Sequence, residues 1–473
     1  MGERPNILVV ITDHQRADSI GMVQCGQEVM PRLNEFASES TVFTRAYTTA
    51  PLCIPARTAM STGQYPTSGI SINDFSGREA KEQQLVSVRL EEAGYNIAYV
   101  GKNDIRTRPE TRKQHKQGSW IDKEDFEQWL EETGLAEFPG WENRRDAFLD
   151  YFYKEVEEVL PDGPVTSRYS HPATGKWEGE LENFRDFYFY HRMRDWLEKQ
   201  AGEDGPFAAF FSIPSPHPPL VVPEPYASIY DPAAISLPAN VGLPAEGEPA
   251  NRSRAVARQL AQDASEADHR KAWAAHLGLL TLADDIFGSL LDDLERLGLR
   301  ENTLVIFTSD HGHHLGQHNM FGINELYEQT VHVPFIANLP EGHNGIFEQP
   351  VSHLSIAPTL LELAGLPPDP GMPRQSLLPS IATGQTPPDE PQFFQFSGQI
   401  GYGYYRRGVV TRHYKYIYDP EDEPELYHLT SDPLETTNLA RLPEYATILA
   451  DHHALCRQWH ERQGDLLDFE HSG

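Results

Sequence analysis

The chain has 473 residues, of which 39% are hydrophobic and 10% aromatic, so it is long enough for one large domain and a smaller one. Its 70 acidic residues outnumber 39 basic residues and give a net charge of −31, which disfavours nucleic acid and anionic membranes as partners. No apolar run reaches membrane-spanning length. Three cysteines and an N-terminus without a signal-peptide core predict a cytoplasmic protein that has no disulfide framework.

Four continuous apolar runs predict strands that are buried on both faces, as in parallel sheets. These runs are residues 7–11, 97–100, 207–213 and 304–307. Periodic segments predict helices at 31–39, 84–93, 272–296 and 354–363. Short β-like runs at 393–396, 408–411 and 414–418 precede a final helix at 446–463. This alternation of strands and helices indicates the α/β class.

Three stretches interrupt the pattern and suggest the domain organisation. Residues 106–182 are charged, aromatic and poor in periodicity, and residues 238–255 are rich in Pro, Ala, Gly and Glu. We expect both to be insertions that shape the mouth of a site. The Pro-rich stretch 367–391 predicts a linker between a catalytic domain at 1–366 and a C-terminal subdomain at 392–473.

Each of the four predicted strands leads to a polar residue suited to chemistry. In chain order these residues are Asp13, Lys102, His217, and the pair Asp310 and His311. Ligands of open α/β sheets bind beyond the carboxyl ends of the strands. The sequence therefore predicts that these five side chains gather at one edge of the sheet.

A further reactive residue, Cys53, precedes a short helical run. Pro55 suits the first turn of a helix and Gly63 suits its exit, so Cys53 falls at or near the helix N-terminus. Free backbone N–H groups and the positive end of the helix dipole favour an anion there. Arg57 lies about one helical turn further on.

The stretch from Cys53 to Arg57 resembles the activation motif of type I sulfatases, which belong to the alkaline phosphatase-like superfamily. Other segments resemble motifs of that family in the family's own order along nearly the whole chain. They are Pro5 to Asp13, Gly101-Lys102, Pro216 to Pro219, Ser309 to His318, Tyr327-Glu328, Val331 to Pro334, and several between Tyr414 and Ala440. The Pro-Ala-Arg and Asp-His-Gly elements are most similar to the choline-sulfatase-like and phosphonate monoester hydrolase branches.

The resemblance implies a large mixed, mostly parallel sheet flanked by helices and a small C-terminal α+β subdomain with a short antiparallel sheet. It also implies that a maturation enzyme oxidises Cys53 to formylglycine, whose hydrated aldehyde attacks sulfur and forms a covalent sulfo-enzyme. The expected activity is hydrolysis of a small or carbohydrate sulfate ester. The net charge makes a long sulfated polymer a less natural substrate than a small anion.

The same resemblance assigns the site residues. It implies that the catalytic residues are Cys53, Arg57, Lys102 and His217. It also implies that one divalent cation is bound by Asp13, Cys53, Asp310 and His311. Carboxylate ligands suit Ca²⁺ or Mg²⁺, and an imidazole shifts the choice slightly towards Mn²⁺. The expected ion is Ca²⁺, with Mn²⁺ or Mg²⁺ as alternatives. His14 stands where the family often has a second aspartate, and it fits either a metal ligand or a hydrogen-bond donor behind the ligands.

Two positions depart from the family. Asp104 stands where many sulfatases carry a histidine, and Ile323 stands where they usually carry a lysine. The substrate-facing half of the site is therefore expected to be rebuilt, with Asp104, Arg106 and His318 among its residues. Arg108 and Arg16 are further candidates for the missing charge, and Asn73 and Asp74 fit either a substrate contact or a turn.

Two other functions remain open. The same scaffold and nucleophile suit a phosphonate monoester or phosphodiester, since a phosphoryl transition state needs much the same metal and cations. The two departures, Asp104 and Ile323, also suit a non-catalytic binding protein descended from the fold.

Overall fold

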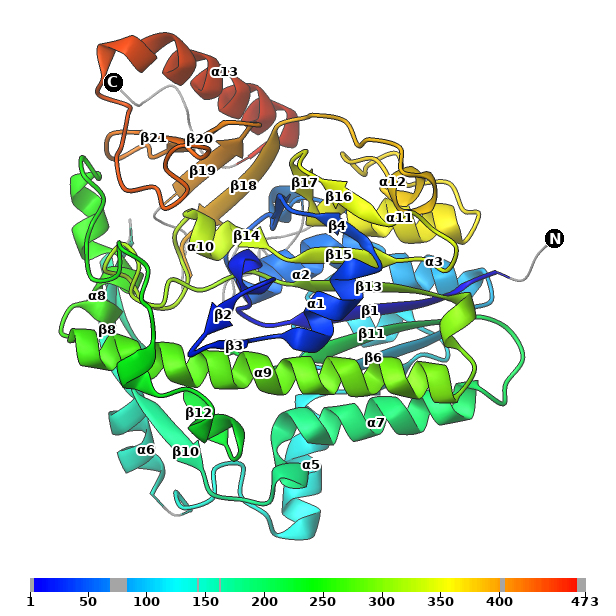
Figure 1. The fold of residues 1–473 in the computed structure, drawn as a ribbon. Coiled ribbons are helices and arrows are strands. Elements are labelled where there is room, and N and C mark those ends of the chain that lie inside the picture. The colour runs from blue at the N-terminus through cyan, green and yellow to red at the C-terminus, as the bar shows by residue number, and fades with distance from the viewer. Residues whose placement is uncertain (1–3, 69–82, 143, 161–162, 400–404, 466–473) are drawn as a thin grey trace.

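The structure is a computed structural model that describes residues 4–68, 83–142, 144–160, 163–399 and 405–465 (Figure 1). An eight-stranded sheet forms its centre. In spatial order the strands are β16 (Gly345–Phe347), β4 (Thr41–Phe43), β15 (Phe335–Asn338), β13 (Thr303–Ser309), β1 (Asn6–Thr12), β11 (Phe207–Ile213), β6 (Asn96–Gly101) and β7 (Ser119–Ile121). The five strands from β13 to β7 run parallel, and β15 is antiparallel to both β13 and β4. The sheet is therefore mixed and mostly parallel, as expected.

Helices cover both faces of this sheet, because its central strands are apolar on both sides. In β1, Leu8 and Val10 pack into one core, whereas Ile7 and Val9 pack into the other. The first core lies under α1 (Pro31–Ser38), α7 (Arg185–Gln200) and α9 (Glu266–Arg296). The second lies under α2 (Cys53–Thr62), α3 (Val86–Glu92), α11 (Ile356–Leu363) and α12 (Leu378–Thr383), on the opposite side of the sheet in Figure 1.

The long predicted insertion, 106–182, contains regular structure that its weak periodicity concealed. It supplies the edge strand β7 and the hairpin of β8 (Tyr153–Leu160) and β9 (Gly163–Ser170). The other elements of this region are α4 (Thr111–Gln114), α5 (Lys123–Thr133), α6 (Arg145–Phe152) and β10 (Thr174–Trp177), which pairs with β12 (Leu220–Pro223). α8 (Val256–Ala261) packs against β8, where the Gln259 side chain exchanges hydrogen bonds with the backbone of Glu157.

The C-terminal part of the chain forms a four-stranded antiparallel sheet. Its strands, in spatial and chain order, are β18 (Gln392–Ser397), β19 (Tyr405–Val410), β20 (Tyr414–Tyr418) and β21 (Glu425–His428). α13 (Ala446–Gln463) covers this sheet, at the top of Figure 1. Smaller elements are β2 (Val23–Gln24), β3 (Gln27–Glu28), β5 (Ala46–Tyr47), α10 (Glu328–Val331), β14 (His332–Val333) and β17 (Val351–Ser352).

Buried ion pairs tie this C-terminal sheet to the rest of the molecule. The guanidinium of Arg252 contacts the carboxylates of Asp419 and Glu425. Arg406 of β19 contacts Asp419 and Glu325. All five side chains are at most 4% exposed, so their charges are compensated by one another rather than by water.

The predicted strands and helices are confirmed, with two informative differences. α9 begins at Glu266, six residues before the predicted start at 272, because Ser265 and Asp268 form a capping box that the hydrophobic pattern does not reveal. The predicted linker at 367–391 contains α12, whose Ile381 is fully buried in the second core. The proposed domain boundaries remain predictions.

Among the described residues, one helix is long and apolar enough to cross a membrane. This helix is α9, but 72% of its apolar window is buried inside the fold. A mostly buried window is typical of the core helix of a folded domain.

α9 also holds α1 in place through Asp284, whose carboxylate accepts hydrogen bonds from the backbone N–H groups of Arg32 and Leu33. We expect Asp284→Ala to lower the free energy of unfolding by about 1–3 kcal/mol, because one buried and one partly buried backbone donor lose their partner. Asp292→Ala is the control, since its pair with Arg32 is exposed and is worth about 0–1 kcal/mol. Urea unfolding measures both, and equal losses would contradict this role.

Candidate active site

The four predicted strand ends meet at one edge of the sheet, because β13, β1, β11 and β6 are neighbours in that order. Asp13 follows β1, and its carboxylate lies 2.6 Å from the Nζ atom of Lys102, which follows β6. The ring of His217, in the segment between β11 and β12, lies 4.6 Å from the ring of His14. His311 follows β13, with its ring 4.6 Å from that of His14. The prediction from strand order alone is therefore confirmed.

Cys53 joins this cluster from α2, the helix that packs on the second core. It is the first residue of α2, which ends at Gly63 in the left-handed conformation, as the sequence predicts. Its Sγ atom lies 3.2 Å from Nε2 of His311, 3.8 Å from Oδ1 of Asp13 and 3.5 Å from Nζ of Lys102. The thiol is thus buried at a helix N-terminus among a carboxylate, an ammonium and an imidazole.

Arg57 stabilises the two carboxylates of the cluster. Its Nη2 atom lies 3.1 Å from Asp13 and its Nε atom 2.8 Å from Asp310. The remaining donor, Nη1, binds the hydroxyl of Ser212 and the carbonyl oxygen of Lys102. Because Arg57 is 2% exposed, these four acceptor contacts replace the water that the guanidinium loses.

Burial and charge set the protonation states at this edge. Burial opposes ionisation of Asp13, but Lys102 and the other cations around it hold its pKa well below the usual range. Burial also opposes the charge on Lys102, yet Asp13 and Cys53 hold the pKa of that ammonium well above its usual range. Burial and the nearby Lys102 lower the pKa of His217 to about 3, so its imidazole is neutral at pH 7.

His14 is the least compensated side chain of the cluster. It is 3% exposed, and neither ring nitrogen has a hydrogen-bond partner among the described residues, although Nε2 lies 3.5 Å from Oδ1 of Asp13. Burial and the neighbouring His311 hold its pKa well below the usual range. A neutral, buried imidazole without a partner is suited to coordinating a cation.

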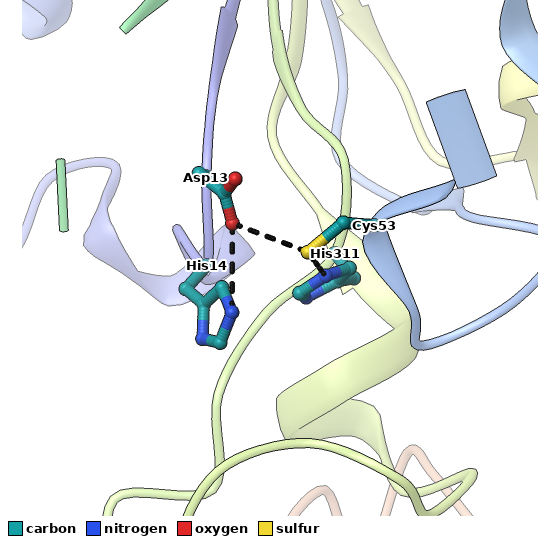
Figure 2. A group of neighbouring side chains, drawn as sticks. All are labelled: Asp13, His14, Cys53 and His311. Atoms are coloured by element: carbon teal, nitrogen blue, oxygen red, sulfur yellow. Dashed lines mark hydrogen bonds and ion pairs between the residues drawn. The ribbon is translucent and has the colours of Figure 1, made fainter. Parts of the chain in front are cut away.

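Figure 2 shows Asp13, His14, Cys53 and His311 converging. Their ligand atoms all lie within 4.8 Å of one another. Asp310 lies beside them, 3.7 Å from Nε2 of His311, and its Oδ1 atom accepts from the backbone N–H groups of His14 and His311. This set of oxygen and nitrogen atoms, together with the unpartnered His14, fits a divalent cation.

A cavity of about 430 Å³ opens beside the cluster, within the size range of ligand sites. Four residues of the cluster line it: His14, Cys53, Lys102 and His217. The other lining residues are Ile54, Asp104, Arg106, Tyr153, Arg168, Tyr169, Ser170, Pro218, Leu260, Gly322, Ile323, Asn324 and Gln399. Its lining contains three basic side chains, Lys102, Arg106 and Arg168, and one carboxylate, Asp104. In the whole chain, by contrast, acidic residues outnumber basic ones. The cavity therefore suits an anion despite the net charge.

The structure brings some of the predicted substrate-binding residues to this cavity and places others elsewhere. Asp104 and Arg106 line it. His318 does not, because its ring is buried 4.1 Å from the ring of Tyr327, in a stacked arrangement. Arg16 lies away from it against Trp273 and Asp18. Arg108 is not among the lining residues, and Asn73 and Asp74 lie outside the described residues.

Several lining residues escaped the sequence analysis. Tyr153, Arg168 and Tyr169 come from the β8–β9 hairpin, and Asn324 and Gln399 come from loops. The turn between two alternating segments was the available signal for the hairpin. Nothing in the sequence pattern links Gln399 to Cys53, which lies 346 residues earlier in the chain.

Comparison with known proteins identifies the family. Residues 5–366 match the model of the sulfatase family, which is more than half of the chain. The chain belongs to the sulfatase family. It is accordingly a sulfuric ester hydrolase. Residues 316–462 also match a second family model, which is described as N-sulphoglucosamine sulphohydrolase, C-terminal.

Relatives of this sulfatase cover almost the whole chain. It is 27% identical to an ulvan-active sulfatase of Formosa agariphila, over 94% of this chain and 79% of that protein. It is 25% identical to a choline-sulfatase of Rhizobium meliloti, over 96% of this chain and 87% of that protein. The structure of a phosphonate monoester hydrolase from Silicibacter pomeroyi superposes with a TM-score of 0.77 at 21% identity, over 98% and 96% of the two chains. This last similarity shows that the two proteins share a fold.

Arg57 should matter for stability because of the two buried carboxylates it binds. We expect Arg57→Met to lower the free energy of unfolding by about 3–5 kcal/mol when a chelator is present, since Asp13 and Asp310 are left without their shared partner. Arg112→Met is the control: its pair with Asp122 is partly exposed, and such pairs contribute about 0–1 kcal/mol. Guanidinium unfolding measures both variants. A loss below about 1 kcal/mol for Arg57→Met would contradict the assignment.

Proposed function

We propose that this sulfatase hydrolyses the sulfate ester of a small or carbohydrate alcohol through a formylglycine nucleophile formed from Cys53. The observation that carries the proposal is the position of Cys53, which lies at a helix N-terminus within 3.8 Å of Asp13, Lys102 and His311. The S–O bond to the alcohol breaks, and water is the ultimate source of the oxygen added to the released sulfate.

Formylglycine would supply, as its hydrated aldehyde, an attacking hydroxyl at the place where the Sγ atom of Cys53 now lies. The chain's own residues prepare that place. Lys102, 3.5 Å from Sγ, keeps its proton because the neighbouring Asp13 raises its pKa, so its ammonium can bind a sulfate oxygen. Neutral His217 lines the same cavity and can donate its ring N–H to a second sulfate oxygen.

Asp13, His14, Asp310 and His311 would hold one divalent cation beside residue 53. Such a cation lowers the pKa of a bound hydroxyl and neutralises sulfate charge. We propose Ca²⁺ or Mn²⁺, with Mg²⁺ as a third candidate; two imidazoles beside two carboxylates give Mn²⁺ more weight than the sequence suggested. In the same scheme Arg57 keeps the carboxylates in position, and Asp104 and Arg106 contact the alcohol part of the substrate.

The maturation enzyme that reads the Cys53 motif is the macromolecular partner in this proposal, and the location is cytoplasmic. The three cysteines all lie in the described residues and form no disulfide with one another, which agrees with a reducing compartment. No nucleic acid or membrane partner is invoked, because the net charge of −31 opposes both.

A phosphonate monoester or phosphodiester is the second candidate substrate class. It is favoured by the TM-score of 0.77 to a phosphonate monoester hydrolase. Rates on a sulfate ester and a phosphodiester with the same leaving group separate the two: a higher kcat/KM for the phosphodiester would overturn our proposal. A non-catalytic binding protein, the third reading, is disfavoured because Cys53, Lys102 and His217 line one cavity.

Residue 53 should be formylglycine when the protein is produced together with a maturation enzyme. Peptide mass spectrometry of active protein tests this, and a thiol alone at residue 53 would rule out the nucleophile. Cys53→Ala should abolish turnover while the thermal unfolding temperature changes little, because the substitution removes one buried atom and no ion pair.

Metal and activity should be lost together in Asp310→Ala. This substitution removes one carboxylate of the group and the partner of the Arg57 Nε atom. Elemental analysis after gel filtration, with kcat/KM on an aryl sulfate, is the measurement. Asp18→Ala is the control, since Asp18 pairs with Arg16 away from the cluster. A full equivalent of metal in Asp310→Ala would show that Asp310 is no ligand.

A further inference from the structure

Two buried amide side chains in the cavity wall lack a partner for their carbonyl oxygens. Asn324 is 3% exposed and Gln399 is 6% exposed, and both line the cavity. Neither Oδ1 of Asn324 nor Oε1 of Gln399 has a hydrogen-bond partner among the described residues. A buried acceptor without a donor costs about 1–3 kcal/mol, so a ligand that supplies donors here regains that free energy.

Buried neighbours fix the backbone at both positions. The backbone N–H of Gln399 donates to the carboxylate of Glu158, on the β8 strand, at 2.8 Å. Asn324 has a φ of 90°, a strained value for a residue other than glycine, and it precedes Glu325, whose buried carboxylate lies 3.2 Å from Arg406. The backbone positions that carry the two amides are therefore set by the fold before any ligand binds.

The remaining polar groups of the wall include both donors and acceptors. Asp104, whose carboxylate lies 3.4 Å from Nζ of Lys102, only accepts hydrogen bonds when ionised. Arg106 and Arg168 only donate. Hydroxyl groups match such a mixture because each one donates and accepts, whereas a quaternary ammonium or an unsubstituted aryl ring offers no donor.

Aromatic and apolar side chains complete the same wall. Tyr153 and Tyr169 come from the hairpin, and Leu260 and Ile323 lie in the lining with them. A sugar ring presents C–H groups on its faces and hydroxyl groups around its edge. It is therefore suited to a wall in which apolar surface alternates with fixed polar groups.

We infer that Asn324 and Gln399 determine specificity by accepting hydrogen bonds from hydroxyl groups of the alcohol, so that the preferred substrate is a sulfated sugar or similar polyol. This inference rests on the proposed sulfate ester hydrolysis. It assigns one contact to the C-terminal part of the chain. It also places an alcohol that has no hydroxyl group beyond the sulfated one, such as choline, among the poor substrates.

The test compares three kinds of substrate: a panel of hexose monosulfates, choline sulfate and 4-nitrophenyl sulfate. The variants are Asn324→Gly, which suits the positive φ, and Gln399→Leu, which keeps the side-chain size. Each should lower the ratio of kcat/KM for the best hexose sulfate to that for 4-nitrophenyl sulfate by about tenfold or more. Gln395→Leu is the control, because Gln395 is a fully buried amide on β18 outside the cavity lining.

A second readout does not depend on turnover. In the Cys53→Ala background, calorimetry should show that each substitution weakens binding of the hexose sulfate by about tenfold, and that Gln395→Leu does not. Unchanged ratios and unchanged binding in both variants would overturn the inference, as would a preference for choline sulfate over every hexose sulfate. If the wild type hydrolyses no sulfate ester but hydrolyses a phosphodiester, the proposed function fails, and the binding measurement still decides the role of the two amides.

Discussion

The guanidinium of Arg57 is the contact on which the site depends, because it joins three strand ends and one helix. It binds Asp13 after β1, Asp310 after β13 and the carbonyl oxygen of Lys102 after β6, while its own backbone belongs to α2. Two carboxylates at the edge of one sheet would repel each other without such a cation. Their orientation in turn decides where Cys53, His14 and His311 can converge.

A second group of buried charges fixes the position of the cavity wall, as Arg57 fixes the carboxylates of the cluster. Glu325 follows the lining residues Ile323 and Asn324, and it contacts Arg252 and Arg406. Removing one member of a buried ion group is costly, since the others keep their charge without water or a partner. The C-terminal sheet is thereby fixed to the loop that lines the cavity, so substrate contacts depend on residues far from the reacting atoms.

Much of the central sheet and the inner site could be predicted from the sequence because both follow local rules. Continuous apolar runs mark the buried strands, and the parallel order brings Asp13, Lys102 and His311 to one edge. The start of α9 was missed because a capping box has no hydrophobic signal. The cavity wall was missed because Gln399 reaches it through a tertiary contact to Glu158, which no periodicity encodes.

The strand order also has a consequence for the timing of synthesis. β1 lies between β11 and β13, so the edge that surrounds Cys53 cannot form before residue 310 has left the ribosome. Translation proceeds at about 5–20 residues per second, so the stretch between Cys53 and Asp310 takes on the order of 10 to 50 seconds. During that interval the cysteine motif stays in a chain without its final partners. A modifying enzyme that needs an unfolded peptide therefore acts within a period set by the topology of the sheet.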